Sequence, residues 1–136
     1  MNSLFPLLLT ENRTACREFY QTVFGFEVVA ELDWYTQLVS PENPAIGLGF
    51  MSPDNPGIPD GYQTTPGCVV TIDVDHVDAV WEKAKTAASD SITMEPKDEE
   101  WGQRHIVLVD PSGCLVDVVQ AIAPSQAFLE ANGMVG

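Results

Sequence analysis

Apolar and polar positions along the first part of the chain follow two different periods. Between residues 14 and 24 the apolar side chains recur at the spacing of a helix that packs one face on a sheet. These side chains are Cys16, Phe19, Tyr20 and Val23. Short apolar runs separated by turn residues predict strands at 4–9, 26–31, 33–40 and 45–51. This segment therefore predicts the element order βαβββ.

The same order of elements is predicted a second time further along the chain. A strand is expected at 67–74, and Asp75 is the expected N-cap of the helix that follows. The apolar face of this helix has the same spacing as the first one, with Val77, Val80, Trp81 and Ala84. Three more strands are expected at 92–96, 104–109 and 114–121. The prediction is an α+β fold made of two βαβββ modules.

The segments outside the two modules differ from them in composition. Residues 52–66 hold four prolines and two glycines, a density that disfavours regular structure and indicates a stiff linker. We therefore expect one domain over residues 1–136, with module one at 3–51, module two at 67–121 and a tail at 122–136. Within the tail, a helical turn is expected near residues 126–132.

The turn between the last two predicted strands is explicit in the sequence. Asp110 can bond back to the backbone, Pro111 presets the next φ angle, and Gly113 suits the closing position. Asp117 interrupts the apolar strand that follows this turn. Because a buried carboxylate is costly unless it is paired, Asp117 is a candidate ligand or pocket group.

Composition adds a strong charge bias. The chain has 20 acidic and 6 basic residues, a net charge of −14 and a pI near 4.1. Such a field repels nucleic acid and anionic membranes and attracts cations. It indicates either a surface adapted for solubility or a protein that captures a cationic small molecule.

Two features of the sequence concern the compartment. The apolar runs, such as residues 7–9 and 106–109, are too short to cross a membrane, and the N-terminal segment lacks the pattern of a signal peptide. Cys16, Cys68 and Cys114 occur singly, without CxxC spacing. A reducing cytoplasm is therefore expected, with the thiols as small buried side chains.

The two modules and several short motifs resemble the vicinal oxygen chelate superfamily, which includes glyoxalase I, extradiol dioxygenases and bleomycin-resistance proteins. The motifs are Arg17-Glu18-Phe19-Tyr20 with Phe24-Gly25-Phe26, then Val74-Asp75-His76-Val77-Asp78, and then Trp101-Gly102-Gln103-Arg104 leading into the Asp110 turn. The resemblance covers residues 3–121. It implies that the modules form a curved mixed sheet around a cleft, with the helices on the convex side.

The resemblance also implies four metal-ligand positions, one in the opening and one in the closing strand of each module. The first position is Phe5 here, and the closing strand at 46–51 contains no acid, histidine or cysteine. The third position lies near Val69, and the fourth alone keeps an acid, Asp117. One carboxylate is too few to hold a divalent metal. We therefore expect no metal site and no cofactor.

The expected binding site is a cleft with aromatic and polar walls, because aromatic rings hold planar ligands by stacking. The candidate ligand-binding residues are Phe5, Trp34, Tyr35, Gln37, Phe50, Val69, Trp101, Arg104, His105 and Asp117. Tyr35 and Gln37 share one face of their strand, and Trp34 shares the other face with Thr36. The sequence does not decide which of these faces lines the cleft.

Several residues have competing interpretations. Arg104 either edges the ligand site or forms a salt bridge with an acid such as Glu99 or Glu100. Trp81 is assigned to the core because it lies on the apolar helix face, and His76 is assigned to a solvated turn.

His105 lies in the strand beside that of Asp117, so the two side chains meet in some registers and not in others. If they meet, they form an acid–base pair or part of a ligand set. Otherwise His105 belongs to the surface or to a dimer interface.

Three functions remain open on the sequence. The first is a metal-independent binding protein of the bleomycin-resistance type, which sequesters a cationic or planar aromatic ligand such as an antibiotic. The second is a lyase, isomerase or dioxygenase with a divergent site at Asp117 and His105. The third is an interaction module whose cleft has closed. A homodimer is expected, with the apolar tail around Phe128 and Leu129 as a contact.

Overall fold

The computed structural model describes residues 2, 4–64 and 67–134, and the chain divides into two compact units. The first unit comprises Met1–Cys68 and Asp110–Cys114, and the second comprises Val69–Val109 and Leu115–Gly136. The predicted boundaries at residues 3, 66 and 136 lie outside the described residues. The sequence did not indicate that the turn at Asp110 belongs with the first unit.

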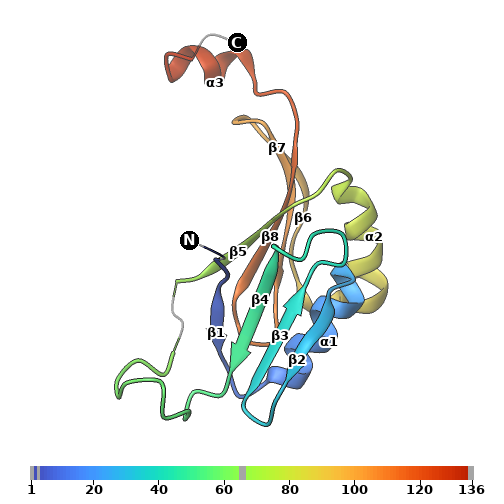
Figure 1. Cartoon of the computed structure of the whole chain (residues 1–136). Helices are drawn as coiled ribbons and strands as arrows, with labels where there is room; N and C mark the ends of the chain where they lie inside the picture. Colours follow the sequence, from blue (N-terminus) through green and yellow to red (C-terminus); the bar gives the residue numbers. More distant parts are fainter. Residues whose placement is uncertain (1, 3, 65–66, 135–136) are drawn as a thin grey trace. The chain divides into compact units, whose positions relative to one another are not determined.

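The first unit is a four-stranded sheet with one helix (Figure 1). Its elements are β1 (Leu7–Leu9), α1 (Arg13–Phe24), β2 (Glu27–Glu31), β3 (Tyr35–Val39) and β4 (Gly47–Met51). The strands are ordered β1-β4-β3-β2, with β1 parallel to β4 and the other pairs antiparallel. The predicted βαβββ order is confirmed, although β1 is shorter than the predicted strand.

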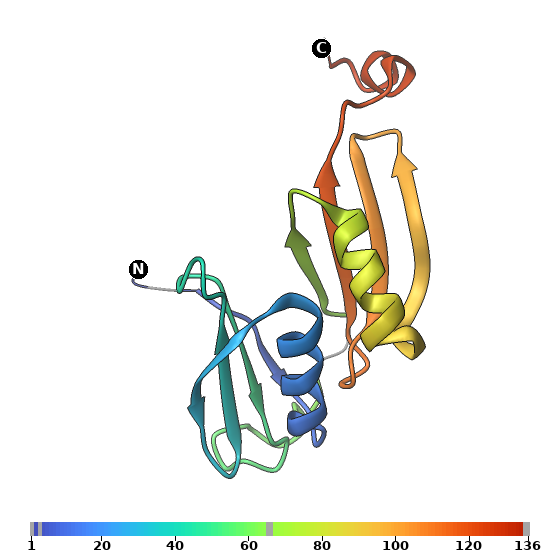
Figure 2. The same ribbon diagram turned by 90° about the vertical axis from the view of Figure 1, so that its right-hand side faces the viewer.

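The second unit repeats this topology with the strand order β5-β8-β7-β6. Its elements are β5 (Val69–Asp73), α2 (Val77–Ala87), a 3₁₀ turn η1 (Ser89–Ser91), β6 (Ile92–Glu99), β7 (Gln103–Val109), β8 (Leu115–Ala121) and α3 (Gln126–Ala131). Figure 2 shows α2 lying across one face of this sheet. None of the helices in the described part of the chain combines the length and apolar character needed to cross a bilayer.

Strand β6 continues past Pro96, where the sequence predicted that it would end. It is an edge strand, and a proline is tolerated there because the missing N–H need not join a ladder. The pairing of Glu99 with Gln103 closes the hairpin to β7. This extension is what brings Glu99 onto the sheet.

Helix α1 and one face of its sheet form the core of the first unit. Leu38 and Phe50 are fully buried, and Leu48 nearly so. Tyr20 of α1 is also fully buried, with its ring centroid 5.6 Å from that of Phe50 and 5.9 Å from that of Phe26. The apolar period read from the sequence therefore marks the buried face of this helix.

Helix α2 covers the corresponding face of the second sheet. The fully buried residues here are Val77, Ala84, Ile106, Leu108, Val116 and Val118. Trp81 is only partly buried, with the Lys85 ammonium 5.4 Å from its ring centroid, so its assignment to the core is corrected. The long indole reaches the edge of the helix face, where a lysine can cover it.

The expected cap of α2 also needs correction. The helix begins at Val77 and its N-cap is His76, which is exposed and makes no capping bond through its side chain. The Val77 amide instead donates to Oε1 of Gln120 in β8, at 2.9 Å. The Gln120 side chain thus caps the first amide of the helix, which is the role predicted for Asp75.

Asp110 is a buried acid in the first unit and is only 3 % exposed. Its Oδ1 accepts the Ser112 amide at 2.8 Å and the Cys114 amide at 3.1 Å. Its Oδ2 accepts the Tyr20 hydroxyl at 2.7 Å, across 90 positions of sequence. The predicted backbone contact of Asp110 is therefore confirmed, and the turn is additionally anchored to α1.

Burial raises the pKa of Tyr20 well above its ordinary value, and the Asp110 carboxylate raises that pKa further. The same two causes raise the pKa of the Cys16 thiol to about 12. Both groups therefore stay protonated at neutral pH. The Tyr20 hydroxyl acts as a donor to the buried carboxylate.

We expect Tyr20→Phe to lower the free energy of unfolding by about 1–3 kcal/mol, because it leaves a lone pair of the buried carboxylate without its donor. Urea denaturation measures this loss. Tyr62→Phe is the matched control, since Tyr62 is 71 % exposed. Equal stability of the two variants would show that the bond between Tyr20 and Asp110 adds nothing to the fold.

Candidate functional site

The face of the second sheet opposite α2 carries a group of polar side chains. Because side chains alternate along a strand, the burial of Ile106 and Val118 under α2 places His105 and Asp117 on the other face. Val69 pairs with Leu115, two residues from Asp117, and shares this open face. Of the candidate residues, the structure therefore brings Val69, His105 and Asp117 onto one surface.

His105 and Asp117 are in direct contact. Nδ1 of His105 lies 2.7 Å from Oδ1 of Asp117. Beside an ionised carboxylate, which only accepts hydrogen bonds, a neutral imidazole carries its proton on Nδ1 and its lone pair on Nε2. The sequence left this contact open because it depended on the register of β7 against β8. The register pairs Val107 with Asp117 and His105 with Val119, which makes the two side chains diagonal neighbours.

A second carboxylate lies on the other side of the imidazole. Oε1 of Glu99 is 3.8 Å from Nε2 of His105, and it also pairs with the Lys97 ammonium at 2.7 Å. The side chain of Glu99 is 10 % exposed. From the sequence, Glu99 is a candidate only for a salt bridge with Arg104, because the predicted strand ends at Pro96.

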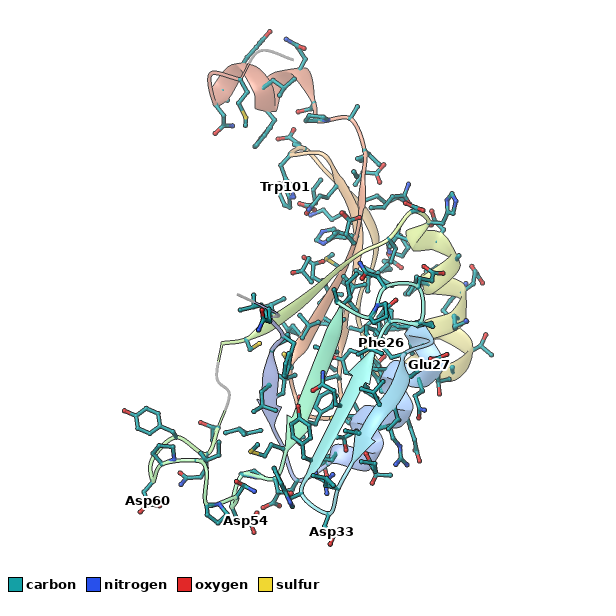
Figure 3. All side chains as sticks on the ribbon, in the orientation of Figure 1. Phe26, Glu27, Asp33, Asp54, Asp60 and Trp101 are labelled. Atoms are coloured by element: carbon teal, nitrogen blue, oxygen red, sulfur yellow. The ribbon has the colours of Figure 1, made fainter. Side chains whose placement is uncertain are left out.

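Trp101 stands at the turn between β6 and β7, as Figure 3 shows. Its indole N–H donates to Oε1 of Gln103 at 2.9 Å, and its ring centroid lies 6.3 Å from that of His105. The indole is about half exposed. An aromatic surface thus lies beside the two carboxylates and the imidazole.

Arg104 does not belong to this group. It donates to Asp78 of α2 and to Asp98, with both closest contacts at 2.9 Å. These hydrogen bonds raise the pKa of Arg104, and they lower the pKa of Asp78. The prediction of Arg104 as a ligand contact is therefore corrected to the alternative, a salt bridge. Its partners are Asp78 and Asp98 because Arg104 alternates with His105 and points to the helix side.

The open face of the first sheet carries Tyr35 and Gln37. The Tyr35 hydroxyl donates to Oε1 of Gln37, and desolvation raises the pKa of Tyr35. Thr36, between them, is fully buried and accepts from Arg13 of α1 at 3.0 Å. The sequence could not decide which face was open, and the position of α1 decides it. Trp34 lies just before β3, is 42 % exposed and contacts the Tyr35 ring.

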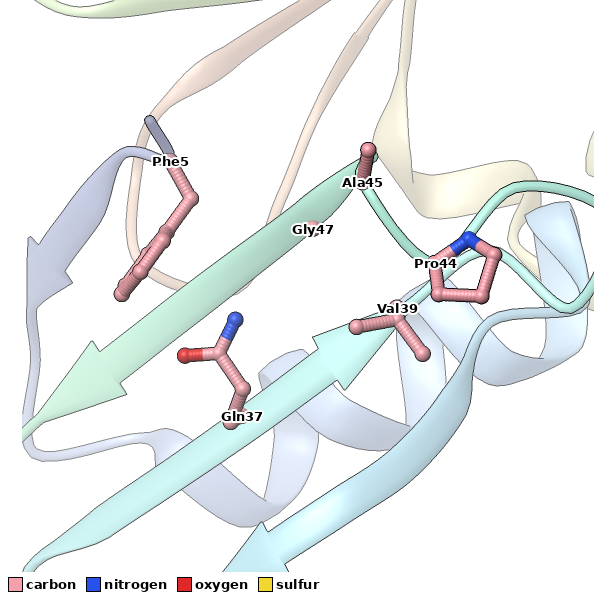
Figure 4. A pocket seen from close by; sticks show the side chains of 6 residues that line it. All are labelled: Phe5, Gln37, Val39, Pro44, Ala45 and Gly47. Atoms are coloured by element: carbon pink, nitrogen blue, oxygen red, sulfur yellow. The ribbon is translucent and has the colours of Figure 1, made fainter. Parts of the chain in front are cut away.

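A hollow of about 330 Å³ lies on this unit (Figure 4). It is lined by Phe5, Gln37, Val39, Pro44, Ala45 and Gly47. Phe5 and Gln37 were predicted, whereas the other four were not. The alternating glycines at 47 and 49 were the missed signal, because glycine within a strand often marks a close approach. A Cβ on Gly49 would lie 3.0 Å from the Tyr35 hydroxyl oxygen.

Phe50 has no exposed surface and packs on Tyr20. Its prediction as a ligand-binding residue is therefore corrected to a core role. Phe50 pairs with Thr36 and alternates with Gly49, so it points to the side covered by α1.

The side chains on the two open faces decide whether a metal ion could be held there. Within residues 2, 4–64 and 67–134, no group of three or more His, Cys, Asp or Glu side chains could hold a metal ion. Asp117 and Glu99 lie beside different nitrogens of His105, and these two ring nitrogens point in different directions. One ion therefore cannot use all three side chains.

The sequence profile described as the Glyoxalase/Bleomycin resistance protein/Dioxygenase superfamily matches residues 7–118 of the chain. The chain belongs to this superfamily. The resemblance inferred from the motifs is thereby confirmed. A comparison with curated proteins finds no match.

Solved structures of this superfamily share the fold. A bleomycin resistance determinant encoded on transposon Tn5 is 20 % identical, with a TM-score of 0.66 and coverage of 89 % of this chain and 98 % of the other. TnmS3, an antibiotic binding protein from Streptomyces sp. CB03234, is 17 % identical, with a TM-score of 0.68 and coverages of 89 % and 96 %. Lactoylglutathione lyase from Agrobacterium tumefaciens is 18 % identical, with a TM-score of 0.67 and coverages of 88 % and 94 %.

We expect the protein purified without chelator to retain no stoichiometric divalent metal, because Phe5, Val69 and the strand β4 offer no carboxylate, imidazole or thiolate. Elemental analysis checks this, followed by melting curves with nickel, cobalt, zinc, manganese and anaerobic ferrous iron. One tightly held ion per chain, or a clear rise in Tm with any of the five, would contradict the expectation.

Proposed function

We propose that this protein is a metal-independent binding protein for a flat organic small molecule, acting by sequestration as in drug resistance. The observation that carries the proposal is the hollow of about 330 Å³ lined by Phe5 and Gly47. Phe5, just before β1, and Gly47, in β4, lie where the superfamily resemblance implies metal ligands. The phenyl ring of Phe5 and the side-chain amide of Gln37, which also lines the hollow, suit stacking and hydrogen bonding to a planar molecule.

The superfamily and the charge support this proposal. Two proteins with this fold are a bleomycin resistance determinant and an antibiotic binding protein. The net charge of −14 attracts cations, so a flat cationic ligand would be favoured over an anionic one. The half-exposed rings of Phe5 and Trp34 in the first unit offer stacking surface for such a ligand.

Ligand binding is tested with melting curves in bleomycin, in the flat cationic dye proflavine and in the flat neutral compound phenazine. We expect proflavine or bleomycin to raise Tm, since a ligand at about 100 times its Kd stabilises the folded state by about 2.7 kcal/mol. Ala45→Phe fills the hollow and should abolish the rise. Ala127→Phe, at an exposed position of α3, is the control and should keep it.

A rise in Tm that is the same in Ala45→Phe and Ala127→Phe would show that the ligand does not bind in the hollow. Stabilisation by phenazine and not by proflavine would show that the ligand is not cationic, and the proposed binding function would stand. No response to any flat compound would contradict the proposal and favour the interaction module.

A second candidate function is a lyase, isomerase or dioxygenase, and the 2.7 Å contact between His105 and Asp117 favours it. A carboxylate that orients an imidazole is the arrangement of a general base. Lactoylglutathione lyase has the same fold, so the adduct of methylglyoxal and glutathione is a suitable trial substrate.

For this candidate we expect Asp117→Asn to lower turnover by about 100-fold or more, because general acid–base catalysis contributes factors of this size. Turnover is followed by absorbance, and stability by urea denaturation. The candidate is rejected if the wild type converts no trial substrate above the level of Asp117→Asn.

We also propose a homodimer in a reducing cytoplasm. The tail residues Phe128 and Leu129 are only half-buried in one chain, and Cys16 carries a free thiol. Light scattering should give twice the chain mass of 14.8 kDa, and a mass of one chain would refute the dimer.

A further inference from the structure

The imidazole of His105 has one unused hydrogen-bonding position. Within the described residues, its Nε2 is the one buried side-chain nitrogen or oxygen without a hydrogen-bond partner. The residue is 9 % exposed, and Nδ1 is held by Asp117 at 2.7 Å. In the neutral imidazole, Nε2 therefore carries a lone pair that accepts no hydrogen bond from the protein. A buried acceptor without a hydrogen bond destabilises the folded state, so a donor supplied by a ligand would be favoured.

The carboxylate nearest to Nε2, that of Glu99, is also a hydrogen-bond acceptor. Oε1 of Glu99 lies 3.8 Å from Nε2, which is too long for a hydrogen bond, and a carboxylate and a neutral imidazole nitrogen are both acceptors. Lys97 pairs with Glu99 from the solvent side, where its own side chain is 62 % exposed. A group that carries two N–H donors and a positive charge would satisfy both acceptors together.

Trp101 supplies the third part of the arrangement. Its half-exposed ring lies edge-to-face against the imidazole, in the turn between β6 and β7 and outside their ladder. The π face of an indole attracts cations. A ligand that reaches Nε2 would displace this ring and then stack against it.

We propose that Glu99, His105 and Trp101 form a subsite for a planar cation with two N–H donors, of the amidinium or guanidinium class. One N–H of the cation donates to Nε2 and the other to Glu99, while the indole covers the flat face. The subsite rests on the proposed binding function and names the charged group of its ligand. It lies on the second unit, whereas the hollow lies on the first.

The probe is benzamidine, a flat aromatic amidinium, and benzamide is its neutral counterpart of the same shape. Binding is followed by Trp fluorescence and by the ¹⁵N resonances of the His105 ring in labelled protein. We expect benzamidine to bind in the millimolar range and to shift the Nε2 resonance more than the Nδ1 resonance. Benzamide should bind at least about tenfold more weakly, since it brings no charge to Glu99.

Two pairs of variants separate the subsite from the general attraction of cations to an acidic protein. Glu99→Gln should weaken benzamidine binding at least about tenfold, whereas Glu100→Gln removes the same charge from an exposed neighbour and should leave binding unchanged. Lys97→Gln should strengthen binding because it removes the competitor for Glu99. Lys85→Gln, which disrupts an ion pair on α2, should not.

The proposal is overturned if benzamide binds as well as benzamidine, if Glu99→Gln and Glu100→Gln behave alike, or if the Nε2 resonance does not move at saturation. The binding function fails separately. If flat ligands stabilise the wild type and not Ala45→Phe while benzamidine gives no signal at His105, the subsite is wrong and the binding protein stands. If benzamidine binds at His105 and no larger flat compound binds the hollow, the subsite stands and the function proposed from the hollow is wrong.

Discussion

The buried carboxylate of Asp110 is the constraint on which the first unit depends. A charge that is 3 % exposed is tolerated only when its oxygens are fully bonded, and the Tyr20 hydroxyl and two amides of the turn provide those bonds. This requirement ties a turn near the end of the chain to the first helix. The aromatic cluster around Tyr20 then positions β3 and β4, whose outer faces carry the hollow.

Alternation of side chains along the strands connects the packing to the chemistry. In each unit the helix covers one face of the sheet, so every second side chain of a strand is buried. In the first unit Phe50 and Thr36 are buried in this way, while Tyr35 and Gln37 lie on the open face. In the second unit the same rule sends Arg104 to Asp78 and leaves His105 beside Asp117. The residues available for a ligand are thus those that the helices do not use.

Membership of the superfamily accounts for the fold but does not supply the reaction, because one fold carries many chemistries. This chain has phenylalanine, valine and glycine where metal-binding relatives are expected to have ligands. It keeps a histidine between two carboxylates, with one nitrogen bonded and the other free. Such a group can accept a proton, which the enzymatic candidate uses, or an N–H donor, which the proposed subsite for a planar cation uses.

The sequence by itself determined the order of the elements, the two helices with their buried faces, the turn at Asp110 and the superfamily, since these depend on local spacing and turn chemistry. Tertiary structure decided the rest. The meeting of His105 with Asp117 depended on the register between β7 and β8, and the arrival of Glu99 depended on an edge strand that tolerates Pro96. The roles of Phe50 and Arg104 depended on which face of its sheet each helix covers, and the role of Trp81 depended on where the buried face of α2 ends. Register and face are set by contacts between segments distant in sequence, and no local pattern encodes them.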